Sequence, residues 1–451
     1  MQPLSSFQEL FLQEIGQQSG FVYESDKTKR FLSYPQFWKQ VEENPIADVP
    51  SVGIFCDGSL TTLVSLFSYV HAKKRVILLD PYADESVLKK QIEATNPALL
   101  LGPEALVEAY SGLYQDRGEE IHPDILFFTS GTTSSSKAVV LTEQSLCRSA
   151  YNGSYCLPLK PEDILLSILP WNHVFGFVCG ILWGVECGAS VALSRGRRHF
   201  YDDCSYFQPT AVSFVPQMAG FLLMKNLLNP ELKLILIGAG DCPDEVLYGL
   251  KQKGIRVSFG YGLTETSSGI ALSLGDDPRK MTICPDCKLV LGPDKEILVH
   301  APLVWMQGYY QDEESTKKTI YDGYLHTGDL GFIDDQGLLS ITGRKKEILL
   351  LSDGTKIFLP EFEGELKKIL GEELAVLQNR KGQLILALER NVDGIVDKLN
   401  EFNFICIEDM FDLFIVLFCC CLNKIPCEHI MLIAIPSRKY ILRSNLILFE
   451  H

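Results

Sequence analysis

The residues of this chain that are best suited to chemistry lie in one short polar segment. From residue 129 the chain has seven hydroxyl side chains and one glycine, followed by a lysine, in the order Thr129-Ser130-Gly131-Thr132-Thr133-Ser134-Ser135-Ser136-Lys137. Small residues let a backbone approach an anion closely, and their N–H and O–H groups donate hydrogen bonds to phosphate oxygens. The composition therefore predicts a phosphate-binding loop, although not a Walker A loop, which requires Gly-x4-Gly-Lys-[Ser/Thr].

The flanking residues predict the elements that position this loop. Residues 125–128 form an apolar run with the length of a short buried strand, and a helical pattern begins after Leu141 with Thr142 as its N-cap. The alternative is a flexible Ser/Thr linker. A linker would require neither the strand before it nor the lysine at its end, so we favour the phosphate-binding loop.

Strands and helices alternate ahead of the loop. Buried strands are predicted at residues 51–56, 75–79 and 97–101, and a helix is predicted at residues 60–72. This alternation is typical of parallel βαβ units with helices on both faces of the sheet. The expected fold class is therefore α/β, with the loop at the carboxyl end of a strand, where open α/β sheets bind ligands.

The chain opens with an apolar pattern at helical spacing, formed by Leu4, Phe7, Leu10, Phe11 and Ile15. The pattern predicts an amphipathic helix. A helix lying on a membrane surface is the alternative, but such helices carry Lys or Arg on the polar face, and this segment has neither. We expect the helix to pack on the protein.

Composition limits the classes of function. The chain has 451 residues, of which 46% are hydrophobic and 22% charged, which is enough for a large core and two or more domains. The net charge of −16 argues against a nucleic acid partner, whereas ATP binding requires only local positive charge. Residues 1–20 lack the features of a secretory signal, so the 14 cysteines are expected to be reduced and the protein cytoplasmic.

One cysteine pair, Cys284 and Cys287, has the spacing of zinc and redox motifs. No second pair stands at the distance that a zinc site requires. We interpret the spacing as coincidental.

A second polar segment, Tyr261-Gly262-Leu263-Thr264-Glu265, follows a predicted strand. Tyr261 can stack on a base, Thr264 can hydrogen-bond a phosphate, and Glu265 can hold Mg²⁺ through oxygen. A five-residue segment of this kind is weak support by itself, but it gains weight from its place after the phosphate loop.

Taken in order and spacing, these segments resemble the acyl-adenylate-forming superfamily, which contains acyl-CoA synthetases, luciferases and the adenylation domains of peptide synthetases. Phe128 to Thr133, followed by Lys137, is similar to the phosphate loop of that superfamily. The usual loop has Gly, Pro and Gly where this chain has Ser134, Ser136 and Ala138. The segment at 261–265 matches the family's Tyr-Gly-x-Thr-Glu motif at every fixed position.

The resemblance implies further residues of a nucleotide site. Gly238-Ala239-Gly240, after an apolar strand, is similar to the Gly-rich segment beside the adenine, although it can also be only a tight turn. Asp329 would hold both ribose hydroxyls, and its two acceptor oxygens suit a diol; the alternative is a turn residue. Arg344 would reach the ribose or a phosphate, unless it belongs to a solvated basic turn. Lys346 matches the family's hinge position.

The resemblance also implies where the acid and the thiol bind. His173, after a strand that ends at Pro170, would line the acyl pocket together with Gly262, although a lone His is more often structural. Amino-acid-activating relatives usually place an Asp near this segment, which here has no carboxylate. An unpaired ammonium in an apolar pocket would cost several kcal/mol, so we expect an acid without an α-amine. Gly354, in a segment that looks most like fatty acyl-CoA synthetases, would line the pantetheine channel.

The end of the chain resembles the family less. The family's small lid carries a lysine in a Gly-Lys-Ile-x-Arg tail, which reaches the carboxylate and the α-phosphate. Aligning Ile441 and Arg443 with that tail puts Tyr440 at the lysine position, and a slip of one residue puts Lys439 there, which we favour.

The expected organisation is a large α/β domain of parallel sheets flanked by helices, at 1–345, and a small mobile α+β lid at 346–451. The lid is atypical beyond about residue 400. The apolar run 411–422 is too short to span a bilayer, so we expect a buried helix or strand, with aberrant sequence as the alternative.

The implied activity has two halves. A carboxylate, expected to be a fatty acid, attacks the α-phosphorus of ATP and gives an acyl-adenylate and pyrophosphate; the acyl group then passes to the thiol of CoA. ATP, Mg²⁺ and CoA are thus the expected cofactors and co-substrates. The catalytic residues implied are Lys137, Thr132, Glu265 and Lys439, of which Glu265 and Thr132 would bind the metal.

Three alternatives remain open at this point. The acid can be aromatic or short, such as o-succinylbenzoate. The acceptor can be the phosphopantetheine of an acyl carrier protein. The chain can also be a non-catalytic nucleotide-binding protein, because the assignment of Lys439 depends on a slip in the alignment. Nucleic acid and an integral membrane segment are not expected.

Overall fold

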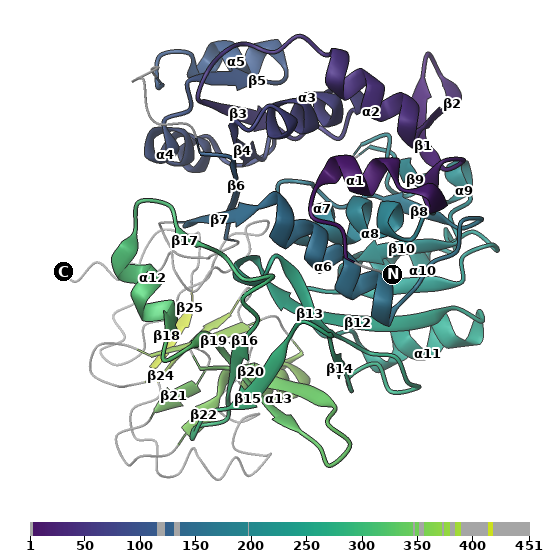
Figure 1. Cartoon of the computed structure of the whole chain (residues 1–451). Helices are drawn as coiled ribbons and strands as arrows, with labels where there is room; N and C mark the ends of the chain where they lie inside the picture. The colour runs from purple at the N-terminus through teal and green to yellow at the C-terminus, as the bar shows by residue number, and fades with distance from the viewer. Residues whose placement is uncertain are drawn as a thin grey trace, which may run out of the picture. The chain divides into compact units, whose positions relative to one another are not determined.

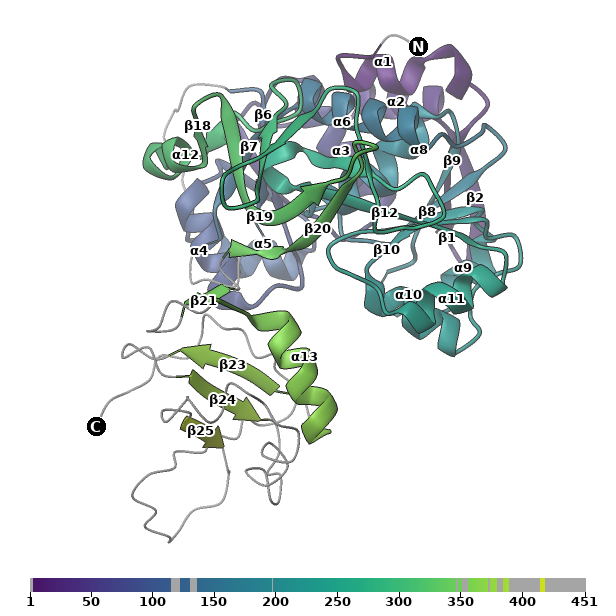
Figure 2. The same cartoon turned by 90° about the horizontal axis from the view of Figure 1, so that it is seen from below.

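The computed structural model describes residues 3–114, 122–129, 136–196, 198–345, 348–350, 356–371, 374–378, 384–388 and 414–417. The described residues form two compact units (Figures 1 and 2). The first contains the described residues up to 327 together with 332–340. The second contains the described residues of 328–331 and those from 341 onward. The predicted domain boundary after residue 345 stays a prediction.

The largest sheet of the first unit runs in the order β14-β13-β12-β11-β10-β8-β9-β1-β2. Neighbours from β12 to β1 are parallel, and the strands at both ends pair antiparallel. The strands are β1 (Gly20–Ser25), β2 (Thr28–Ser33), β8 (Ile164–Ser167), β9 (Ser190–Leu193), β10 (Ala211–Phe214), β11 (Leu234–Ile237), β12 (Arg256–Leu263), β13 (Ser268–Leu272) and β14 (Thr282–Ile283).

A second sheet carries the phosphate loop, in the order β17-β7-β6-β4-β3-β5. Its members are β3 (Ser51–Phe55), β4 (Arg75–Leu79), β5 (Leu99–Leu101), β6 (Asp124–Phe128), β7 (Ala138–Thr142) and β17 (Gly308–Tyr309). The predicted strands and their parallel pairing are confirmed, with helix α3 (Leu60–His71) between β3 and β4. The parallel α/β fold class is therefore confirmed.

The strand β7 was not expected from the sequence. It pairs antiparallel with β6, so the phosphate loop connects two strands of a hairpin instead of leading straight into a helix. The apolar side chains of Val139 and Leu141 are fully buried, which favours the extended conformation. Helix α6 (Glu143–Cys156) then begins with the predicted N-cap, Thr142, whose side chain accepts a hydrogen bond from the Ser145 N–H at 3.0 Å.

The remaining sheets lie later in the chain. One contains β15 (Lys288–Leu291), β16 (Glu296–His300), β18 (Ile320–Tyr321), β19 (Tyr324–Ile333) and β20 (Leu339–Arg344). The second unit has the hairpin of β21 (Ile348–Leu350) and β22 (Lys356–Phe358), the helix α13 (Leu359–Leu370), and the sheet of β23 (Leu374–Gln378), β24 (Leu384–Leu388) and β25 (Phe414–Leu417). Of the apolar run 411–422, the described residues 414–417 form a strand, and the other residues of the run lie outside the described part.

Helices cover the sheets of the first unit. Those not yet given are α1 (Phe7–Leu12), α2 (Tyr34–Glu43), α4 (Glu85–Thr95), α5 (Glu104–Tyr110), α7 (Val174–Phe177), α8 (Trp183–Glu186), α9 (Asp203–Phe207), α10 (Pro216–Met224), α11 (Asp244–Gln252) and α12 (Glu313–Thr319). Short 3₁₀ turns span Glu14–Gly16 and Thr264–Thr266, and a π-helical turn, Val178–Leu182, joins α7 to α8. Among the described helices, none combines the length and apolar character that crossing a bilayer requires.

The opening helix is shorter than predicted. It ends at Leu12, because Gln13 is extended and its side-chain amide donates a hydrogen bond to the Val185 carbonyl at 2.7 Å. Ile15 therefore lies in the following 3₁₀ turn and is 39% exposed. Phe7, Leu10 and Phe11 are fully buried, which confirms that the helix packs on the protein.

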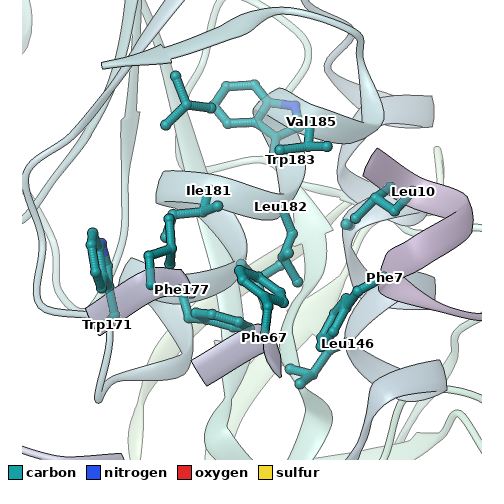
Figure 3. Close-up of a cluster of buried hydrophobic side chains, with 14 of the residues drawn as sticks. Phe7, Leu10, Phe67, Leu146, Trp171, Phe177, Ile181, Leu182, Trp183 and Val185 are labelled. Carbon is teal, nitrogen blue, oxygen red and sulfur yellow. The ribbon is translucent and has the colours of Figure 1, made fainter. Parts of the chain in front are cut away.

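The core beneath α1 fixes the helical segment 174–186, which follows His173. Figure 3 shows Phe7 of α1, Phe67 of α3 and Phe177 of α7 close together, with ring centroids 5.0 Å apart for Phe7–Phe67 and 5.9 Å for Phe67–Phe177. Edge-to-face and stacked rings of this kind add specific attraction to the burial of apolar area. The segment that begins at His173 is thus anchored by aromatic packing from two other helices.

Close backbone contact also positions this segment. A Cβ atom at Gly176 would lie 2.1 Å from the Pro170 carbonyl oxygen, and one at Gly184 would lie 2.8 Å from a methyl group of Val191 in β9. Any residue other than glycine would push the helix away from the sheet. The turn that carries His173 therefore packs closely against Pro170, at the end of the preceding segment.

Helix α8 places an acid in this core. Glu186 is 1% exposed, and neither of its carboxylate oxygens has a hydrogen-bond partner among the described residues. Burial raises the pKa of Glu186 to about 7. Transfer of an unpaired carboxylate from water is costly, so the folded protein holds this group protonated to a higher pH than the unfolded chain does.

We expect the protein to lose stability as the pH rises from about 4.5 to 7. The unfolded chain releases the Glu186 proton at the lower end of this range and the folded protein at the upper end, so the free energy of unfolding falls by about 3 kcal/mol in between. Glu186→Gln should remove this slope in urea unfolding measured at several pH values. Glu245→Gln, at an exposed position of α11, should retain it; equal slopes in both variants would contradict the assignment.

Candidate functional site

The ends of the phosphate loop are tied together by the backbone. The Thr129 N–H donates to the Lys137 carbonyl at 3.0 Å, and the Lys137 N–H donates to Thr129 Oγ1 at 3.2 Å. Ser136 accepts a hydrogen bond from the Gln91 side chain of α4 at 3.2 Å. Thr129 and Lys137 are therefore held side by side at the mouth of the loop, as a hairpin connection requires.

Lys137 and Glu265 meet at one tyrosine that the sequence did not single out. The Lys137 ammonium lies 4.5 Å from the centre of the Tyr309 ring, which is a cation–π contact. The Tyr309 hydroxyl donates to Glu265 Oε1 at 2.7 Å. The two predicted catalytic residues, far apart in the sequence, are thus brought to opposite ends of the same side chain.

The strand β17 holds Tyr309 in this place. Tyr309 pairs with Val139 of β7, two residues after Lys137. The Tyr309 N–H donates to Thr316 Oγ1 at 2.8 Å. Just before it, the Met306 N–H donates to the Glu265 carbonyl at 2.7 Å. One segment, 306–310, therefore bridges the phosphate loop and the turn that carries Glu265.

Burial keeps Tyr309 a hydrogen-bond donor. Burial and then the neighbouring Glu265 carboxylate raise the pKa of Tyr309 well above its ordinary value. The phenol is therefore protonated at neutral pH, and it orients the carboxylate that it contacts. None of the other described residues donates a hydrogen bond to the second carboxylate oxygen of Glu265, Oε2, so this oxygen is available to a ligand.

The turn after β12 is shaped by backbone strain. A Cβ atom at Gly262 would lie 1.8 Å from the Ser268 carbonyl oxygen, so only glycine fits there. Ser267 and Ser268 have φ values of 53° and 109°, which residues other than glycine rarely adopt. Strain of this kind is common at functional sites. Tyr261, Thr264 and Glu265 are all half-buried around this turn.

The Gly-rich segment after β11 touches the His173 segment. A Cβ atom at Gly238 would lie 2.8 Å from the tip of the Phe175 ring. Ala239, the next residue, has φ 64°, in the left-handed region that favours glycine, and it is exposed with Gly240. Two predicted parts of the site, one for adenine and one for the acid, therefore lie next to each other.

His173 is the N-cap residue of α7, and its N–H donates to the Pro170 carbonyl at 3.3 Å. The surrounding protein lowers the pKa of His173, and the Asp80 carboxylate at the end of β4 opposes that shift. Asp80 thus supplies, from a distant segment, the carboxylate charge that the segment around His173 does not contain. The argument against an amine-bearing acid, which relied on the absence of a carboxylate in this segment, is weakened by the Asp80 charge.

The predicted ribose residues form an ion pair within the second unit. Asp329 Oδ1 lies 2.7 Å from Arg344 Nε, and Asp329 is 2% exposed. Asp329 lies inside β19 and not in a tight turn, so the turn-residue alternative is wrong. Carboxylate oxygens accept hydrogen bonds, as binding a diol requires.

The remaining predicted site residues lie outside the described part of the chain. They are Ser130, Gly131, Thr132 and Thr133 of the loop, Lys346, Gly354 and Lys439. Their roles stay predictions.

The described residues contain no cluster of three or more His, Cys, Asp or Glu side chains that could hold a metal. Glu265 is a single carboxylate. Mg²⁺ is usually held by one or two carboxylates and by the phosphates of a bound nucleotide, so a single oriented carboxylate fits a nucleotide-dependent magnesium site.

Comparison with known proteins agrees with the sequence motifs. A model of the AMP-binding enzyme family matches residues 54–292, more than half of the chain. The chain is 34% identical over 261 residues to a 2-succinylbenzoate–CoA ligase of Bacillus cytotoxicus, an alignment that covers 53% of this chain and 53% of that protein. The match thus spans about half the length of this curated relative.

Solved structures share the fold. One is the o-succinylbenzoate coenzyme A synthetase of Bacillus subtilis in complex with AMP, with a TM-score of 0.74 and 20% identity over 94% of this chain and 95% of that chain. Another is the same synthetase in complex with ATP and a magnesium ion, with a TM-score of 0.73 and 20% identity over 92% of this chain and 96% of that chain. With its motifs, its fold and a family model that covers more than half of its length, this chain belongs to the AMP-binding enzyme family.

Proposed function

We propose that the protein is an AMP-forming ligase that joins a carboxylic acid to CoA. The observation that carries this proposal is the junction of Lys137, Tyr309 and Glu265 at the mouth of the phosphate loop. A cation and an oriented carboxylate on the same tyrosine suit a nucleoside triphosphate with its metal ion. The membership of the AMP-binding family gives the proposal its reaction class.

In the first half of the proposed reaction, the acid carboxylate attacks the α-phosphorus of ATP, and pyrophosphate leaves. Lys137 would leave the Tyr309 ring to neutralise phosphate charge, and the loop hydroxyls would donate hydrogen bonds. Glu265 would hold Mg²⁺, which supplies further positive charge when bound. Tyr261 would lie on the adenine, and Asp329 would bind the ribose hydroxyls.

In the second half, the acyl group passes from AMP to the thiol of CoA. As the family resemblance implies, the lid would rotate about Lys346 before this half and carry Lys439 away from the site. Gly354 would then line the pantetheine channel. The named relatives are CoA ligases, which supports CoA as the acceptor more than a carrier-protein phosphopantetheine.

The acid is proposed to be aromatic, of the 2-succinylbenzoate type. The relatives named above are ligases for that acid, which supports the aromatic alternative better than the fatty acid that the Ser-Asp-Gly-x-Lys pattern suggested.

Pyrophosphate release across a panel of acids tests the proposal. With ATP, Mg²⁺ and CoA present, kcat/KM for 2-succinylbenzoate should exceed that for long-chain fatty acids by about 100-fold or more, because a ligase discriminates between acids through its contacts with the acyl group. Preference for fatty acids would restore the original expectation. If the protein binds ATP but releases no pyrophosphate from it with any acid of the panel, the non-catalytic nucleotide-binding protein is favoured.

Tyr309→Phe tests how Glu265 is oriented. The variant keeps the ring beneath Lys137 and removes the hydroxyl that holds the carboxylate. We expect the Mg²⁺ concentration for half-maximal ATP binding, measured by calorimetry, to rise about 10-fold, as is usual when the partner of a metal ligand is lost. Tyr310→Phe is the neighbouring control and should bind normally. An unchanged Mg²⁺ requirement in Tyr309→Phe would separate Tyr309 from the metal site.

A further inference from the structure

Three hydroxyl residues follow Glu265 directly, and all three are buried. Thr266 and Ser267 are 0% exposed, and Ser268 is 5% exposed. A buried hydroxyl group needs a hydrogen-bond partner, because its transfer from water is otherwise costly. Each of the three finds its partner in a different part of the first unit, so the turn that carries Glu265 is held by three separate side-chain contacts.

Two of these contacts shape the turn and set it against the helical segment that follows His173. Thr266 Oγ1 accepts a hydrogen bond from the Leu263 N–H at 2.9 Å and donates one to the Ser268 carbonyl at 2.9 Å. Ser268 Oγ lies 3.5 Å from Cys179 Sγ of the π-helical turn. The turn is thereby closed on itself by one hydroxyl and attached to a neighbouring element by another.

The third contact, from Ser267, ties the turn to α6. The Ser267 hydroxyl donates to Ser145 Oγ at 3.0 Å. Ser145 Oγ belongs to the capping box of α6: it accepts from the Thr142 N–H at 3.1 Å and donates to the Thr142 carbonyl at 3.0 Å. Thr142 is the last residue of β7, the strand that follows Lys137. The hydrogen bond therefore joins the Glu265 turn to the element that leaves the phosphate loop.

The link acts at a strained position. Ser267 has φ 53°, and a residue other than glycine stays in this region only where surrounding contacts outweigh the strain. The Ser267 N–H donates to the Thr264 carbonyl at 3.1 Å, and the Glu265 carbonyl accepts from the Met306 N–H at 2.7 Å. The bond from Ser267 to Ser145 adds a contact with α6 that these backbone bonds do not supply.

We propose that Ser267 and Ser145 are positioning residues for the metal-binding carboxylate, an inference that rests on the proposed function. Their hydrogen bond holds the Glu265 turn on the helix that follows the phosphate loop, while Tyr309 orients the carboxylate itself. Mg²⁺ is bound through one or two carboxylates and the phosphates of its nucleotide, so the carboxylate must keep a fixed distance from the phosphate loop.

Calorimetric titration of the full chain with ATP at a series of Mg²⁺ concentrations tests the proposal. We expect Ser267→Ala to raise the Mg²⁺ concentration for half-maximal ATP binding about 10-fold, as is usual when a group behind a metal ligand is lost. The affinity for AMP in EDTA should be unchanged. Ser267→Gly should give the same result, because glycine adopts φ 53° without strain but lacks the hydroxyl. A normal Mg²⁺ requirement in Ser267→Gly would overturn the proposal, since strain would then explain the alanine variant.

A double variant separates the hydrogen bond from a general loss of stability. Ser145→Ala leaves the buried Ser267 hydroxyl without its acceptor, so this variant should resist urea less well than Ser267→Ala. Ser145→Ala with Ser267→Ala should require no more Mg²⁺ than Ser145→Ala alone, because both substitutions remove one bond. Ser68→Ala is the matched control: Ser68 is 3% exposed in α3 and donates to the Val41 carbonyl at 2.9 Å. It should lose stability and keep the normal Mg²⁺ requirement.

The contrary outcomes are distinct. Independent effects of the two substitutions, which would multiply to about 100-fold in the double variant, would overturn the proposal. A raised Mg²⁺ requirement in Ser68→Ala would also overturn it, since the effect would then follow from stability alone. An unchanged Mg²⁺ requirement in Ser267→Ala would remove this role and leave the proposed ligase intact. Absence of Mg²⁺-dependent ATP binding in the unsubstituted chain would overturn both.

Discussion

Glu265→Gln is expected to lower the rate of pyrophosphate release by about 100-fold or more. The amide supplies no negative charge to Mg²⁺, and loss of one electrostatic contact to the reacting phosphates typically costs this much. The fold should survive, because the glutamine carbonyl oxygen can still accept the hydrogen bond that Tyr309 gives to Glu265 at 2.7 Å. Pyrophosphate release over a range of Mg²⁺ concentrations, with circular dichroism as the check on folding, measures the effect.

The control for this variant is Glu108→Gln, which removes an exposed carboxylate of α5. It should turn over at the rate of the unsubstituted chain. If Glu265→Gln matched it in rate and in Mg²⁺ requirement, Glu265 would have no part in metal binding, and the interpretation of the Lys137–Tyr309–Glu265 junction would be wrong.

Lys439→Ala is expected to slow acyl-adenylate formation by about 100-fold or more and to leave the second half-reaction near normal. A lid lysine supplies the cation that the carboxylate and the α-phosphate need in the first half, and it is swung away in the second. A general folding defect would depress both halves together. Pyrophosphate release measures the first half, and thioester formation from synthetic acyl-adenylate measures the second.

Tyr440→Phe is the matched control, because Tyr440 takes the lysine position when the tail is aligned without a slip. This variant should be silent, since a phenol contributes no cation. Normal acyl-adenylate formation by Lys439→Ala would assign the role to another lysine.

Local sequence patterns determined much of the fold. The strands at 51–55 and 75–79, the intervening helix and the Thr142 cap are set by apolar runs and by one capping side chain, all within a few residues. Such patterns predict structure because burial and capping act over a single element. The motifs around Lys137 and Glu265 likewise pointed to a nucleotide, because each carries its own chemistry at fixed spacing.

Contacts between distant segments could not be predicted in this way. Tyr309 reaches Glu265 across 44 positions of sequence, and its neighbours show no pattern that marks it. The Asp80 carboxylate acts on His173 although the two residues belong to distant segments of the chain. The Arg148 side chain of α6 likewise donates a hydrogen bond to Asp286 at 2.6 Å, across 138 positions of sequence.

The end of α1 shows the physical reason in a single residue. The apolar spacing continues to Ile15, and by itself it predicts a helix as far as that residue. A hydrogen bond from Gln13 to the Val185 carbonyl, 172 positions away, fixes an extended conformation that ends the helix at Leu12. The sequence by itself determined which residues are apolar, which can cap and which can carry charge. The tertiary structure decided which of them meet, because a partner from a distant segment adds a contact that no local pattern contains.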